Sequence, residues 1–347
     1  MTGCEQHIPL LAVTMGDPSG IGPEIAVKTF ARKTDTGSCR LLLVGNDGII
    51  QDAIRMTGLD LRVNAIHDPS EARFGAGIIN VYQIAVDEKD KIRYGEISAE
   101  SGDLAFRSVR AAIELAMAGK VDGIVTGPLQ KEAMHKAGHP FSGHTEILAH
   151  YTGASKYAML LADEDFRIIH ATTHVSLRQA CDLIKKERIL DVIKLMFDVL
   201  QKMGISNPRI GVAGLNPHSS DGGIFGNEEK EEIMPAILEA RNVGIQAHGP
   251  VAPDILFMQA AGGKYDGCVA MYHDQGHIPF KFRSFKWNPK EDKIDHATGV
   301  NITVGLPIIR TSVDHGTAFD IAGKGIASAD AMYQAVEYAV KLVRREA

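Results

Sequence analysis

The chain has 347 residues, of which 45% are hydrophobic and 23% are charged, and its formal net charge is −6. This length and composition are typical of a soluble globular protein with enough core for two domains. The negative balance gives no reason to expect nucleic acid or an anionic membrane as a partner, and no apolar run approaches membrane-spanning length.

The cysteines and the first apolar run predict a cytoplasmic location. The four cysteines lie far apart and form no C-x-x-C pair: Cys4, Cys39, Cys181 and Cys268. This pattern is typical of a reduced protein and not of a disulfide scaffold. The run IPLLAVTM is too short for the core of a signal peptide, so we expect a first strand there.

Short apolar runs alternate with amphipathic stretches along the chain. The runs that predict strands are, in order, PLLAVTMG, RLLLVG, DGIVTGP, YAMLLA, FRIIHATTH, RIGVAGLNP, DGCVAMYHD and NITVGLP. The clearest helices between them are expected over Ala99–Ala118, Ile189–Met203, Glu228–Arg241 and Ala329–Arg345. This alternation predicts an α/β protein with a largely parallel sheet. The polar segment Arg283–Gly299 is expected to form an exposed loop.

The segment MGDPSGIGPE, Met15–Glu24, follows the first predicted strand and opens a helix, with Pro23 suited to the first helical position. It matches neither G-x-G-x-x-G nor the P-loop pattern, so it is a weak signal for a phosphate site. The alternative is a tight strand-to-helix turn. A second segment, SGHTE, would place His144 and Thr145 at a helix start, where free N–H groups attract anions. The alternative there is that Thr145 only caps the helix.

Three predicted strands are followed by a histidine: His174, His218 and His273. Ligands of open α/β sheets bind beyond the carboxyl ends of the strands, so these imidazoles could meet in one place. Three histidines with an open position make a catalytic metal site. The alternative is that each is a satisfied, partly buried histidine, and the chain has no H-E-x-x-H motif that would strengthen the metal hypothesis.

Three further groups favour an anionic substrate. Arg310 offers a planar fork for a carboxylate or phosphate, Lys281 a point charge, and Asn301 a polar amide. Singly, each is more often a solvated surface residue. Together near the predicted strand ends they indicate a substrate that bears an acid or a phosphate.

These motifs together resemble the 4-hydroxythreonine-4-phosphate dehydrogenase family. The resemblance rests on TMGDPSGIGPE, GHTE, TTH, LNPH, MYHDQG and GVNITVGLPIIRTSVDHGTAFDIAGKG, which run from Thr14 to Gly325 in the family's order. It implies two α/β/α domains like those of isocitrate and isopropylmalate dehydrogenases, with the active site in the interdomain cleft. We place the first domain at residues 1–128 plus 306–347 and the second at 129–305. The resemblance also implies a homodimer whose active sites are shared between chains.

The family motifs also imply roles for single residues. The metal ligands would be His174, His218 and His273, with one supplied across the dimer. The substrate contacts would be His144, Thr145, Lys281, Asn301 and Arg310. The implied cofactors are NAD or NADP and one divalent metal, which could be zinc, cobalt, nickel, manganese or magnesium. No residue is assigned to the nicotinamide cofactor, because the chain lacks the dinucleotide fingerprint.

The implied reaction is the oxidation of a secondary alcohol to a β-keto acid, followed by loss of CO2. The general base stays open among Lys281, Asp254 and Asp274. Around the motifs, the segment SSDGGIFG, the residue His277 and the length of Arg283–Gly299 differ from the biosynthetic branch of the family. They favour D-threonate or D-erythronate 4-phosphate as substrate. The alternatives are 4-phosphohydroxy-L-threonine of vitamin B6 biosynthesis, a metal-dependent aldolase or hydrolase without NAD, and a non-catalytic sugar-acid binding protein.

Overall fold

The computed structural model of the chain describes residues 7–33, 37–290 and 293–343, so Cys4 and Arg345 lie outside the described residues. The chain divides into two compact units, which we call unit 1 (Met1–Ser155 with Leu306–Ala347) and unit 2 (Lys156–Gly305). The sequence placed the first crossing between them at 128/129, whereas the segment with the GHTE motif packs within unit 1. Within the described residues, no helix combines the length and the apolar character needed to cross a membrane.

Unit 1 is built on a parallel sheet. Its strands lie in the order β3 (Arg62–Ile66), β4 (Ile78–Gln83), β2 (Arg40–Gly45), β1 (Leu10–Thr14), β5 (Gly123–Thr126) and β14 (Arg310–Val313), and each pair of neighbours is parallel. Strands β1, β2 and β5 are almost wholly buried. Their continuous apolar sequences follow from this, because helices cover both faces of a parallel sheet.

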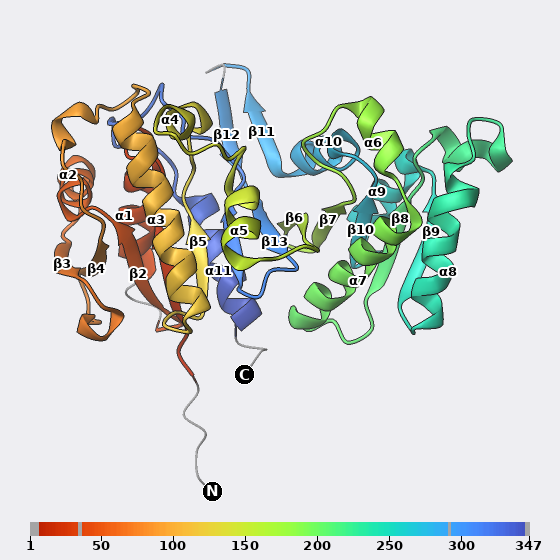
Figure 1. The fold of residues 1–347 in the computed structure, drawn as a ribbon, viewed down its shortest axis with the longest axis horizontal. Coiled ribbons are helices and arrows are strands. Elements are labelled where there is room, and N and C mark those ends of the chain that lie inside the picture. The colour runs from red at the N-terminus through yellow and green to blue at the C-terminus, as the bar shows by residue number, and fades with distance from the viewer. Residues whose placement is uncertain (1–6, 34–36, 291–292, 344–347) are drawn as a thin grey trace, which may run out of the picture. The chain divides into compact units, whose positions relative to one another are not determined.

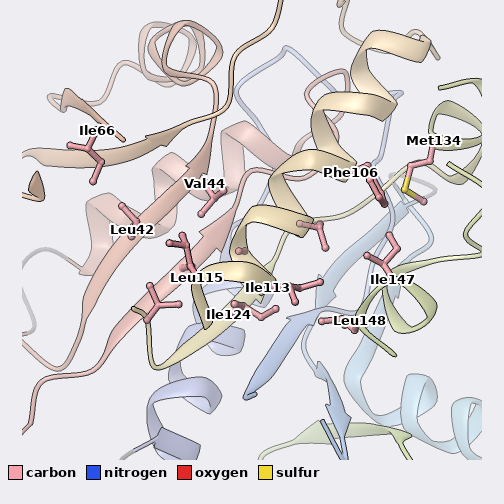
Figure 2. Close-up of a cluster of buried hydrophobic side chains, with 14 residues drawn as sticks. Leu42, Val44, Ile66, Phe106, Ile113, Leu115, Ile124, Met134, Ile147 and Leu148 are labelled. Atoms are coloured by element: carbon pink, nitrogen blue, oxygen red, sulfur yellow. The ribbon is translucent and has the colours of Figure 1, made fainter. Parts of the chain in front are cut away.

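The helices of unit 1 lie on both faces of that sheet. Helix α3 (Ala99–Met117) crosses one face over β1, β2 and β5, together with α4 (Lys131–Lys136) and α5 (His144–Thr152) (Figure 1). Phe106 and Ile113 of α3 and Ile147 and Leu148 of α5 belong to one buried apolar cluster on this face (Figure 2). Burying each such side chain stabilises the fold by about 1.5–3 kcal/mol. The other helices are α1 (Gly22–Lys33), α2 (Asp47–Thr57) and α11 (Asp330–Val343).

Unit 2 has a mixed sheet. Its strands lie in the order β13 (Val300–Val304), β6 (Ala158–Asp163), β7 (Phe166–His170), β10 (Gly267–Ala270), β8 (Arg209–Ala213) and β9 (Gln246–Val251). Strand β6 is antiparallel to both of its neighbours, whereas β7, β10, β8 and β9 are parallel. The predicted α/β class with a largely parallel sheet is therefore confirmed.

Helices α7 (Lys186–Lys202) and α8 (Met234–Asn242) pack against one another and against strands of unit 2. Helices α9 (Pro253–Ala261) and α10 (His273–Ser284) supply the buried cluster that includes Leu256, Phe257 and Phe280. A short helix, α6 (Leu177–Leu183), and an irregular turn, η3 (Pro217–Gly223), follow β7 and β8. These short connections after the strands carry most of the chemistry predicted for unit 2.

Two predictions about segments need correction. Arg283–Gly299 is not a loop, because β11 (Phe285–Asn288) and β12 (Lys293–Ala297) form an antiparallel hairpin directly after α10, with residues 291–292 outside the described part. The segment contains no continuous apolar run, which hid its strands. The strands thought to end at His174, His218 and His273 end earlier, at His170, Ala213 and Ala270. His174 and His218 stand on the connections that follow, and His273 begins helix α10.

Candidate active site

The anion-binding candidate of unit 1 centres on Arg310. This residue begins β14 beside β5, and its side chain is only 3% exposed. Its Nη2 and Nε donate to the hydroxyl Oγ1 of Thr126, at the end of β5, at 2.7 and 3.2 Å. Burial lowers the pKa of the guanidinium to about 9, so the group stays charged at neutral pH. A charged fork with little water around it is a strong receptor for carboxylate or phosphate.

His144 stands next to this guanidinium. It is the first residue of α5, whose N-cap is Gly143, so the alternative that Thr145 caps the helix is wrong. Burial, followed by the charge of Arg310, holds the pKa of His144 well below its usual range, so the ring is neutral. Its buried Nε2 has no hydrogen-bond partner in the described part of the chain. A neutral imidazole beside a buried cation can bind a polar group of an anionic ligand.

The Met15–Glu24 turn packs against the residues that follow β5. The amide of Asp17 donates to the carbonyl oxygen of Pro128 at 2.8 Å, and a Cβ placed on Gly16 would lie 2.6 Å from that oxygen. Gly16 has φ +72°, so the glycine is required by both space and backbone conformation. The alternative of a tight strand-to-helix turn is therefore confirmed.

Asp17 is a polar group that the sequence did not single out. Its Oδ1 accepts from the amide of Ser19 at 2.8 Å, while Oδ2 is buried and lacks a partner among the described residues. Burial raises the pKa of this carboxyl to about 6, against the lowering effect of the Ser19 amide. Its place between two glycine-bearing turns was the only sequence signal, and it marks a turn as readily as a site.

The imidazole cluster of unit 2 brings together two of the three predicted metal ligands. The ring centroids of His174 and His273 lie 5.9 Å apart. Both line a pocket of about 270 Å³, together with Thr173, Val175, Leu177, Ala180, Tyr272 and Asp274. Nδ1 of His273 donates to Oδ1 of Asp274 at 2.7 Å, which leaves Nε2 with its lone pair. An imidazole held this way by a carboxylate is suited to bind a divalent metal.

Two more histidines stand behind His273. His277, one helical turn later, stacks on His273 with centroids 3.7 Å apart and planes 10° apart. His170, at the end of β7, lies 4.7 Å from His277 and is fully buried. Burial lowers the pKa of His277 to about 4 and that of His170 to about 3, with neighbouring histidines adding to both effects. The sequence noticed His277 but missed His170.

His218 stands on a strained connection. The turn η3 after β8 holds four consecutive non-glycine residues, His218 to Asp221, with φ between +46° and +70°. The buried carboxylate of Glu229 holds the start of this turn, accepting from the amides of Leu215 and Asn216 at 2.8 and 2.7 Å. Such strain costs about 1–3 kcal/mol per residue and is found where function requires it.

The predicted metal set is not complete within one chain. In the ranges 7–33, 37–290 and 293–343, no group of three His, Cys, Asp or Glu side chains lies close enough to hold a metal ion. His174 and His273 fit as a partial set, because both border one pocket. His218 is not among the residues that line it.

The remaining predicted residues lie on unit 2. Lys281 is exposed on α10, with Nζ 5.3 Å from the ring centroid of Phe285, and Asn301 lies in β13 opposite Leu161. Of the candidate bases, Asp274 lines the histidine pocket, whereas Asp254, in the first turn of α9, does not. Asp274 is thus the better placed of the two aspartates.

Comparisons with known proteins place the chain in a family. The family model described as pyridoxal phosphate biosynthetic protein PdxA matches residues 37–339. The D-threonate 4-phosphate dehydrogenase of Cupriavidus necator is 43% identical, with 98% of this chain and 99% of that protein covered. The enzyme of the same name from Bordetella bronchiseptica is 46% identical, with 97% and 93% covered.

A solved structure shows the same relationship. The crystal structure of a 4-hydroxythreonine-4-phosphate dehydrogenase from Klebsiella pneumoniae is 44% identical and superposes with a TM-score of 0.84, covering 98% of this chain and 99% of that one. The chain resembles these proteins in sequence and in fold over nearly its full length, and this likeness assigns its family. The chain belongs to the PdxA family, and it is a dehydrogenase of that family.

Proposed function

We propose that this enzyme uses NAD or NADP to oxidise a four-carbon 3-hydroxy acid 4-phosphate, with D-threonate or D-erythronate 4-phosphate as the preferred substrate. The observation that carries the proposal is the buried, charged Arg310 beside neutral His144. A buried, charged guanidinium binds a carboxylate or phosphate strongly, and a phosphorylated hydroxy acid offers two anionic groups. The names of the two bacterial relatives described above support D-threonate 4-phosphate in particular.

The residues divide the work of this reaction. Arg310, with His144 and Thr145, binds one anionic end of the substrate, and Lys281 and Asn301 bind other polar groups. Asp274 or Lys281 removes the hydroxyl proton as hydride passes to the nicotinamide ring. The resulting β-keto acid loses CO2. A divalent metal, when bound, lowers the pKa of the substrate hydroxyl and stabilises the negative charge that develops on oxygen.

His174 and His273 would hold that metal from one chain, and we propose that His218 of a second chain completes the site. Imidazole ligands favour zinc, cobalt, nickel or manganese over magnesium. A homodimer is supported by exposed apolar side chains of unit 2: Leu177, which lines the pocket, is 62% exposed, and Phe282, on α10, is 90% exposed. A second copy that covers these side chains would remove this apolar surface from water.

A substrate panel tests the proposed function. We expect reduction of NAD or NADP, followed at the absorbance of the reduced nicotinamide, with a higher kcat/KM for D-threonate or D-erythronate 4-phosphate than for 4-phosphohydroxy-L-threonine. Unphosphorylated D-threonate is the matched control and should react poorly, because Arg310 then lacks one anion to bind. Sites built to hydrogen-bond one group reject analogues that leave it unpaired.

Two outcomes would overturn the assignment. A clear preference for 4-phosphohydroxy-L-threonine would favour the biosynthetic alternative, which the name of the Klebsiella pneumoniae structure supports. Turnover of a four-carbon phosphate without any reduction of the nicotinamide would favour an aldolase or a hydrolase that uses the same histidines.

A further inference from the structure

Four imidazoles of unit 2 form one row. The ring centroids are 4.7 Å apart from His170 to His277, 3.7 Å from His277 to His273 and 5.9 Å from His273 to His174. The row starts in the core, where His170 is 0% exposed, and ends at the pocket that His273 and His174 line. The candidate metal ligands are thus backed by two histidines that do not line that pocket.

As a purely structural residue, His170 would lower the stability of the fold. Nδ1 donates to the carbonyl oxygen of Met159 at 3.3 Å, so the neutral ring carries its lone pair on Nε2. That Nε2 is buried and has no hydrogen-bond partner in the described ranges. Buried polar atoms without a partner destabilise a fold, and an aliphatic side chain of similar volume would fill the same space. The imidazole therefore calls for a reason beyond packing.

Helix α10 has been shaped to receive this ring. Gly276 lies within the helix, and a Cβ placed on it would stand 2.4 Å from Nε2 of His170. Glycine weakens the interior of a helix, so its presence here follows from the space that the imidazole takes. His170 thereby fixes the first turn of α10, which carries His273 and Asp274.

His277 connects His170 to the metal ligand. Its Nδ1 donates to the backbone carbonyl of His273 at 3.0 Å, while its ring lies flat against the His273 ring. The His273 ring is thus held from two sides, by the stacked His277 and by Asp274 on Nδ1. Groups that orient a metal-binding histidine in this way affect metal affinity strongly.

We propose that His170 is a positioning residue that acts through His277 to hold the His273 ring in the orientation that binds the divalent metal. Because this inference rests on the proposed metal site, its test must separate the two. Removal of His170 should weaken metal binding without weakening the fold. Its effect should also depend on the presence of His277.

The experiment is a double-mutant cycle on the full-length metal-free protein, with Co²⁺ as the probe. The variants are His170→Leu, His277→Leu and the two combined, and the readouts are the Kd for Co²⁺, its visible absorption spectrum and the Tm of the metal-free protein. We expect His170→Leu to raise Kd by on the order of 10- to 100-fold, to change the spectrum and to leave Tm unchanged or higher. In the His277→Leu background the same change should have little further effect.

Control variants separate a failure of the positioning role from a failure of the metal site. His248→Leu removes an exposed imidazole of β9 and should leave Kd unchanged. If His273→Ala binds Co²⁺ as tightly as the unaltered chain, the metal site is wrong. If His273→Ala loses binding while His170→Leu keeps it, or if His170→Leu has the same effect in both backgrounds, the positioning role is wrong. Should His170→Leu not fold, His170→Gln takes its place in the cycle under the same criteria.

Discussion

The two units present their chemistry in opposite electrostatic forms. In unit 1 a charged guanidinium is buried, and His144 is neutral because of its own burial and, to a lesser extent, the charge of Arg310. In unit 2 burial lowers the pKa of His277 and His170, so these two imidazoles are neutral and keep lone pairs. This contrast supports the proposal of an anion site on unit 1 and a metal site on unit 2. Burial disfavours the charged form in both units, and Arg310 stays charged because the ordinary pKa of arginine lies far above neutral pH.

The largest expected effect comes from removing the buried charge of Arg310 in unit 1. Arg310→Ala should lower kcat/KM by a factor that corresponds to about 2–5 kcal/mol, because a charge-assisted contact to the substrate anion is lost. Arg310→Lys should also impair the enzyme, since a point charge cannot reproduce the fork that Thr126 orients. Steady-state kinetics with the best substrate of the panel measure both changes.

Arg55→Lys provides the matched control, because Arg55 is an exposed arginine of the same unit, paired with Asp52. It should leave kcat/KM unchanged. An Arg310→Ala enzyme with unaltered kcat/KM would remove the anion site from unit 1 and with it the contrast between the units.

The next largest effect comes from removing the proposed metal ligands of unit 2. His273→Ala and His218→Ala should each lose bound metal and activity, as measured by elemental analysis and kinetics. Mixing these two inactive proteins should restore about a quarter of full activity, because half of the dimers are hybrids and each hybrid has one complete site. Mixing His174→Ala with His273→Ala should restore none, because those rings share one pocket of one chain.

The pattern of recovery decides which ligand crosses between chains. Recovery in the His174→Ala and His273→Ala mixture would overturn the pairing proposed for unit 2. No recovery in any mixture, with subunit exchange demonstrated, would show that sites are not shared.

The smallest effect is a change in stability. Asp17 has a folded-state pKa of about 6 against an ordinary value of 3.8, so its stability penalty is absent below pH 4 and complete above pH 6. Asp17→Asn should therefore gain on the order of 1–3 kcal/mol relative to the wild type between pH 4 and pH 8. Denaturant unfolding at both pH values measures this, with exposed Asp60→Asn as the control. An equal difference at both pH values would show that Asp17 is ordinary.

Much of the fold follows from the sequence because burial imposes regular patterns. The predicted helices over Ala99–Ala118 and Ala329–Arg345 match α3 and α11 closely, since each needs an apolar stripe facing a sheet. Strands β3, β4, β9, β11, β12 and β14 were missed. β3 and β14 are short and rich in polar residues, so their apolar character is weak. Their pairing partners, which no local pattern reveals, make them strands.

The site was predictable only in part. Motifs identified His174, His273 and Arg310, and the structure places the first two together. His170 and Asp17 were missed, because a histidine in an apolar strand and an aspartate in a turn are ordinary in sequence. What sets them apart is their surroundings. His170 Nε2 and Asp17 Oδ2 are buried without a hydrogen-bond partner among the described residues, and the imidazole lies against Gly276. Such properties exist only once the chain has folded.

The run from His218 to Asp221 has a strained left-handed backbone, and the hydrogen bonds that Glu229 accepts hold the start of the turn in place. An unfolded chain of these residues would leave the left-handed conformation, because only glycine adopts that conformation readily. The protein therefore gives up stability at the turn that carries the exposed His218. Directed evolution for heat tolerance would select glycine at Ser219 or Ser220 early, because glycine relieves the backbone strain. The same substitution would leave the position of His218 less well defined.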